Sequence, residues 1–134
     1  MKELTEGILS TVTEGKVALK TLQKSMKIKN GAPVLVIGTK SNFLRVILLS
    51  HDEVAHVRVS LGLTGFKETA RSLLSGIKSR GLQLIHSTGF CPMRDSCVWE
   101  GYFVADQKDK IQDLCKWVRR LPGIAEVTLK YLTA

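Results

Sequence analysis

The chain has 134 residues, 44% hydrophobic and 24% charged, with a formal net charge of +8 and a pI of about 9.6. This composition is typical of a globular protein and excludes the disordered and fibrous classes. The longest apolar runs, such as 34–37 and 46–49, are far shorter than the roughly 18 residues of a membrane span. The amino terminus has no apolar stretch of signal-peptide length, so we expect a cytoplasmic protein.

The positive charge is concentrated in the amino-terminal part. Residues 1–50 hold eight basic and three acidic residues, a net charge of +5, whereas 51–134 hold 12 basic and nine acidic residues, a net charge of +3. The later charges alternate in sign, as on an ordinary solvated helix face. The basic segment therefore favours an acidic partner for the first part of the chain.

Up to residue 50, apolar and polar residues alternate over short stretches, which is typical of strands. The pattern predicts four strands, at 8–13, 16–20, 32–39 and 43–50, the last two joined by a turn at 40–42. One or two helical turns are expected at 22–28, because Asn30 and Gly31 form a helix-stop signal. This part is predicted to be a small β module with one short helix.

After residue 53 the hydrophobic period changes. Helices are predicted at 66–80 and 107–121, and strands at 55–63, 82–89, 97–105 and 124–132. The order βαββαβ is that of the ferredoxin-like plan, in which a four-stranded antiparallel sheet carries both helices on one face. The predicted fold class is therefore α+β, with domains at 1–50 and 54–134.

The first part carries a family pattern: Glu14-Gly15-Lys16, alternating apolar residues, the short helix, then Asn30-Gly31 and the Val-rich stretch 34–37. Over residues 8–50 it resembles the AbrB/MazE family of swapped-hairpin DNA-binding modules. The resemblance implies that the hairpins of two chains interleave, and that basic residues on the first loop and the short helix contact DNA. A module of about 45 residues buries too little surface to stand alone, which also favours a dimer.

The stretch 16–29 holds no acidic residue and five lysines, which we predict to bind double-stranded DNA: Lys16, Lys20, Lys24, Lys27 and Lys29. Lysine is a hydrated point charge that suits phosphate contact more than base readout. If six to eight lysines of a dimer meet phosphates, log K should fall with log salt with a slope of about −5 to −7. The alternative is a solvated surface that only keeps the protein soluble.

The second part has three family features: the glycine-bearing turn 62–65, the helix exit Arg80-Gly81-Leu82, and 121–127 before the last strand. It resembles the ACT domain, a regulatory βαββαβ module that pairs with a second copy and binds amino acids or similar metabolites. The resemblance implies a ligand site at the turn and the helix start, made by Leu63, Thr64, Gly65 and Phe66. Amides at a helix start can bind a carboxylate. The alternative is a tight connection in which Thr64 caps the helix.

Three cysteines, Cys91, Cys97 and Cys115, do not make an even disulfide framework, so we expect reduced thiols. Cys91, Cys97 and His86 do not supply the four ligands of a structural zinc, so we expect neither metal nor cofactor. His56 and His86 are expected to be strand residues on a packed face.

The sequence holds no nucleophile elbow, P-loop, HExxH or paired carboxylates, so we expect no catalytic activity. We predict a dimeric transcriptional regulator that binds DNA with its first part and senses an amino-acid-like metabolite with its second. The main rival is a structural or protein-interaction dimer. A third possibility is an amino-acid-binding subunit that does not bind DNA.

Overall fold

The computed structural model describes residues 4–62, 66–93 and 95–134 and divides into two compact units, Met1–Pro33 and Val34–Ala134. Each predicted helix and strand is present, although those of the first unit are shorter than expected. No helix among the described residues is long and apolar enough to cross a membrane.

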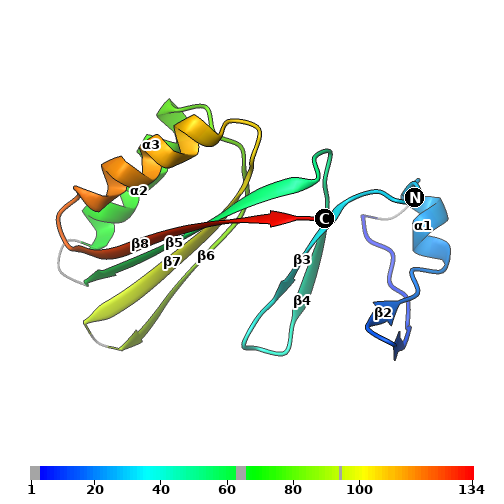
Figure 1. Cartoon of the computed structure of the whole chain (residues 1–134). Coiled ribbons are helices and arrows are strands. Elements are labelled where there is room, and N and C mark those ends of the chain that lie inside the picture. Colours follow the sequence, from blue (N-terminus) through cyan, green and yellow to red (C-terminus); the bar gives the residue numbers. More distant parts are fainter. Residues whose placement is uncertain (1–3, 63–65, 94) are drawn as a thin grey trace. The chain divides into compact units, whose positions relative to one another are not determined.

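The first unit holds the strands β1 (Val12–Thr13) and β2 (Lys16–Val17), paired antiparallel, and the helix α1 (Thr21–Ser25) (Figure 1). The helix ends before Lys27, which has a positive φ of 55°. No residue of 4–33 is buried. A two-stranded hairpin without a core is marginal in water, which explains why the predicted strands 8–13 and 16–20 shrink to two residues each.

The second unit begins with a hairpin of β3 (Val34–Gly38) and β4 (Leu44–Leu48), as predicted. Its residues point alternately to two sides. Leu35 and Ile37 are buried with Val54 and pack against neighbours on the sheet that follows. The outward side, by contrast, is exposed and apolar: Val34, Val36, Leu44, Val46 and Leu48.

The sheet consists of β5 (Glu53–Gly62), β6 (Leu84–Met93), β7 (Ser96–Val104) and β8 (Ile124–Thr133). All neighbours are antiparallel, in the order β6-β7-β5-β8. The helices α2 (Phe66–Ser79) and α3 (Lys108–Arg119) cover one face (Figure 1). This arrangement confirms the predicted ferredoxin-like βαββαβ plan of the second part.

The main core lies between the sheet and the two helices. Alternate residues of β5 point into it, among them Val57 and Val59, where they meet Phe103 of β7 and Ile111 and Leu114 of α3. The strand period of two and the helical period of 3.6 bring these side chains to one layer. This core explains why the second part keeps its predicted elements at nearly full length.

The boundary between the compact units lies earlier than the predicted domain boundary near residue 52. The reason is the burial of Leu35 and Ile37, which ties the hairpin of β3 and β4 to the second unit. The domains 1–50 and 54–134 remain predictions. The swapped-hairpin arrangement is also not shown and remains a prediction.

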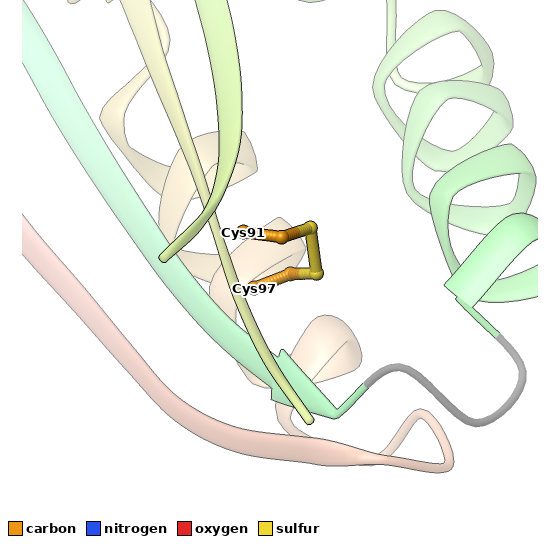
Figure 2. The surroundings of a disulfide bond; sticks show 2 residues. All are labelled: Cys91 and Cys97. Atoms are coloured by element: carbon orange, nitrogen blue, oxygen red, sulfur yellow. A yellow bond between two sulfur atoms is a disulfide. The ribbon is translucent and has the colours of Figure 1, made fainter. Parts of the chain in front are cut away.

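The expectation of three free thiols is wrong for Cys91 and Cys97, which form a disulfide bond (Figure 2). The two cysteines flank the turn between neighbouring antiparallel strands, next to the point where Phe90 faces Val98. The Cα atoms of Cys91 and Cys97 lie 4.0 Å apart. The hairpin, and not the sequence spacing alone, brings them together. Cys115 is free and buried, and burial raises the pKa of its thiol.

Candidate functional site

The predicted ligand turn lies at the start of α2. Leu63, Thr64 and Gly65 are outside the described residues, and nothing is assigned to them. Phe66, the first residue of α2, is half-buried and packs against the main core. The first backbone N–H groups of a helix have no intrahelical partner and favour an anionic group. The described part of the predicted site is therefore the first turn of α2.

A small apolar cavity of about 60 Å³ lies between the start of α2 and the sheet. Phe66 and Leu73 of α2 line it together with Leu61 of β5 and Trp99 of β7. Among the described residues that line it, Thr69 is the one with a hydroxyl group, and its Oγ1 donates a hydrogen bond of 3.2 Å to the carbonyl of Pro122. With this hydroxyl engaged, the cavity offers an apolar surface to whatever enters it.

The Trp99 ring is held in place by Gly101, two residues further along β7. A Cβ atom at Gly101 would lie 2.2 Å from the Trp99 ring, a separation that side chains do not tolerate. The ring also packs against Phe103, with the ring centroids 6.4 Å apart. Trp99 is partly buried, packs against the main core and forms one wall of the cavity.

The size of the cavity limits what it can hold. Drug-sized ligands occupy pockets of roughly 300–1,000 Å³, whereas this cavity has about 60 Å³. It is suited to the end of a short aliphatic side chain.

The five predicted DNA-binding lysines all lie in the first unit, and all five are exposed. None of them forms an ion pair within the part of the chain that the structure describes. The Nζ of Lys20 donates a hydrogen bond of 2.8 Å to the carbonyl of Leu9, and both Lys20 and Lys27 have a positive φ. Of the five, only Lys20 therefore has its ammonium group bound within the described residues, and Lys16, Lys24 and Lys29 have neither such a bond nor a positive φ.

On the face of the sheet opposite the helices, the structure brings together a group that sequence reasoning did not assemble. His56 of β5 is buried and stacks on Tyr102 of β7, with the ring centroids 4.4 Å apart. Its Nε2 lies 3.7 Å from Oε1 of Glu100 and has no hydrogen-bond partner among the residues that the structure describes. Burial lowers the pKa of His56, and the positive charges of Lys130 and Arg58 act in the same direction, against the carboxylate of Glu100.

His86 of β6 joins this face to the hairpin of β3 and β4. Nη1 of Arg45 lies 2.8 Å from Nδ1 of His86. A guanidinium group only donates hydrogen bonds, so Nδ1 of His86 accepts and the ring is neutral. Burial and the charge of Arg45 both lower the pKa of His86. The period-two alternation of β5 already placed His56 opposite the helix-covered face, but the pairing with Arg45 required the hairpin to fold back.

These two histidines predict a loss of stability in acid. Their folded pKa values lie below the ordinary 6.5, so below that pH the unfolded chain takes up protons that the folded chain excludes. The free energy of unfolding should therefore fall as the pH drops from 7.5 to about 5.5. Urea unfolding of the double variant His56→Gln, His86→Gln should show a smaller difference between the two pH values, whereas His51→Gln, at an exposed position, should match the wild type. An unchanged pH difference in the double variant would contradict this.

No protein-family model and no curated protein matches the chain. Among solved structures, it is similar to the C-terminal domain of the MgtC protein from Mycobacterium tuberculosis, with 13% identity and a TM-score of 0.55, covering 65% of this chain and 95% of that one. It is also similar to the ACT domain of GTP pyrophosphokinase from Chlorobium tepidum, with 13% identity and a TM-score of 0.50, covering 57% and 96%.

These likenesses concern the fold alone. They support the ACT-like, ferredoxin-like assignment of the second part. They offer no evidence for the resemblance of residues 8–50 to the AbrB/MazE family, which remains a prediction.

Proposed function

We propose that the protein is a cytoplasmic, dimeric regulator whose ACT-like part senses an amino-acid-like metabolite and whose basic segment binds double-stranded DNA. The proposal includes no catalytic activity. The observation that carries the sensing function is the apolar cavity at the start of α2 in an ACT-like fold. The bound carboxylate would face the first turn of α2, and the side chain would enter the cavity beside Phe66 and Trp99.

The test is a screen of single amino acids by thermal unfolding of the full chain. A ligand present at a hundred times its Kd adds about 2.7 kcal/mol to the free energy of unfolding. For a chain of this length that corresponds to a rise in Tm of roughly 10 °C. We expect aliphatic amino acids to raise Tm, and acidic or basic ones to leave it unchanged. If none of them raises Tm, the sensing proposal fails.

A cavity-filling variant locates the site. Gly89 of β6 lines the cavity, and a Cβ added there meets only the carbonyl of Val98, at 3.9 Å. The variant Gly89→Val should therefore fold but lose the ligand-dependent rise in Tm. Thr88→Val is the matched control, since Thr88 is exposed, neighbours Gly89 and does not line the cavity. If the ligand raises the Tm of Gly89→Val as much as that of the wild type, the ligand does not bind in this cavity.

The observation that supports DNA binding is the set of five exposed lysines, none of them ion-paired within the described residues. Because the contacts would be to phosphates, binding should depend steeply on salt and weakly on sequence.

The rival function, a structural or protein-interaction dimer, has its own supporting observation. The outward side of the hairpin of β3 and β4 is apolar and exposed, with Val36 at 55%, Val46 at 54% and Leu44 at 63% exposure. Such a surface favours a second chain as its partner. Dimerisation through this side is compatible with DNA binding and with a purely structural dimer. Replacement of the exposed lysines distinguishes these two functions, because only DNA binding depends on them.

A further inference from the structure

The disulfide bond lies on the helix-covered side of the sheet, beside the cavity. Cys91 is near the end of β6 and Cys97 near the start of β7, and their side chains meet on the side of the sheet that faces α2 (Figure 2). In the strand register Cys97 pairs with Leu61 of β5, which lines the cavity. The bond is therefore next to the end of β5 from which the chain continues towards α2.

Two residues of the cavity wall lie close to the two cysteines along the strands. Gly89 and Trp99 line the cavity, and each is two residues from one of the two cysteines along its strand. Residues two apart on a strand point to the same face. A displacement of Cys91 with the end of β6 would therefore also move Gly89 relative to Trp99, which lies on β7.

The two sulfur-bearing residues differ in accessibility. Cys97 is completely buried, with 0% exposure, whereas Cys91 is exposed. The strand pairing is also irregular here: the register passes from Phe90 facing Val98 to Met93 facing Ser96. The covalent bond therefore holds a point at which the regular ladder between the two strands is interrupted.

The rest of the unit does not depend on this bond. Over β7 the pairing with β5 is continuous from Ser96 to Val104, and the main core contains Phe103, Ile111 and Leu114. Opening the disulfide would release the end of β6, which is an edge strand, while β7 stays in place. The end of β6 could therefore move on reduction of the disulfide while the rest of the unit stays folded.

We propose that Cys91–Cys97 is a thiol–disulfide exchange site that controls the shape of the cavity. A thiolate of a dithiol reductant attacks Sγ of the exposed Cys91, which forms a mixed disulfide and releases Cys97 as a thiolate that takes up a proton. The second thiol of the reductant then displaces Cys91 as a thiol and closes the reductant's own disulfide. Two electrons and two protons pass to the protein, and the end of β6 moves away from Trp99.

The test uses dithiothreitol on the folded full chain. Cys115→Ala removes the third thiol, and Trp117→Phe leaves Trp99 as the one tryptophan. In this background, reduction should release two thiols per chain and shift the Trp99 emission to longer wavelength as water reaches the ring. Oxidised dithiothreitol should reverse both changes, and unfolding by urea should stay cooperative in both forms.

The matched variant is Cys91→Ser, an exposed substitution that prevents the bond. It should show the emission of the reduced protein under both conditions and lose the response to oxidant. Two results would overturn the proposal: thiols that appear only after urea unfolds the protein, which would make the bond a purely structural cross-link, or thiol release with no change in Trp99 emission. Because no amino acid is added, these outcomes are independent of the sensing function.

Discussion

The triple variant Lys16→Gln, Lys24→Gln, Lys29→Gln is expected to bind duplex DNA about 100-fold or more weakly than the wild type in 0.1 M salt. Each phosphate contact contributes about 0.9 to the slope of log K against log salt, so the three contacts of one chain alone are worth nearly three powers of ten at this concentration, and the second chain of the dimer adds to this. These three side chains are exposed, and their charges have no ion-pair partner among the described residues. Lys20 and Lys27 are kept because their backbones have a positive φ.

The control has the same change in net charge at another place. Lys78 of α2 and Lys110 and Lys116 of α3 are also exposed, and their replacement by Gln should change the affinity by less than about threefold, since charges outside the proposed phosphate contacts act only through a field that salt screens. Fluorescence anisotropy across a salt series measures both variants, and the first should also show a shallower slope. Equal losses of affinity in the two variants would mean that only net charge matters. If the wild type does not bind DNA even at low salt, the DNA-binding proposal fails and the structural or protein-interaction dimer is favoured.

Gly76→Ala is expected to lower the free energy of unfolding by about 1–3 kcal/mol, as overpacking of a core does. At an exposed helical position the same change would raise it by up to about 1 kcal/mol. Here the sign reverses because Gly76 of α2 is buried against α3, and a Cβ would lie 2.2 Å from the ring of Trp117. The Trp117 ring is itself covered by the guanidinium of Arg80, at 4.9 Å, so moving the ring aside would cost this cation–π contact.

Two further variants isolate this contact. Ser75→Ala, at the exposed neighbouring position, should leave stability unchanged or raise it slightly. In the background Trp117→Leu, which removes the ring, Gly76→Ala should cost much less than in the wild type, a coupling that a double-mutant cycle in urea measures. Equal costs in the two backgrounds would show that the helices do not meet at Gly76.

The second part of the fold could be predicted from the sequence because its periods are clear. The helix predicted at 66–80 is observed at Phe66–Ser79, and the strand predicted at 124–132 is observed at Ile124–Thr133. Both elements have one apolar face on the main core, so local pattern and tertiary packing agree. The pattern of β3 predicted a strand as well. That Leu35 and Ile37 pack against side chains of the four-stranded sheet could not be predicted, because these contacts join segments far apart in the sequence.

The candidate site was predictable in part. The sequence predicts a ligand turn before α2, which stays a prediction, and the structure adds a cavity beside it whose wall includes Trp99 and Leu73, residues that share no local pattern with that turn. The disulfide was missed because the strand predicted at 82–89 left Cys91 in the turn before the strand at 97–105, whereas β6 extends to Met93 and includes Cys91. A cysteine in a predicted hairpin turn, with a second one at the start of the next strand, was the available signal.

The most direct test of the whole account is the Kd for a DNA duplex with and without the amino acid that raises Tm most. If the ACT-like part regulates DNA binding, the ligand should change this Kd by at least about fivefold, and by linkage the duplex should change the affinity for the ligand by the same factor. The Gly89→Val variant should bind the duplex as the wild type does but show no ligand effect. A ligand that stabilises the protein and leaves the Kd for DNA unchanged would contradict the account.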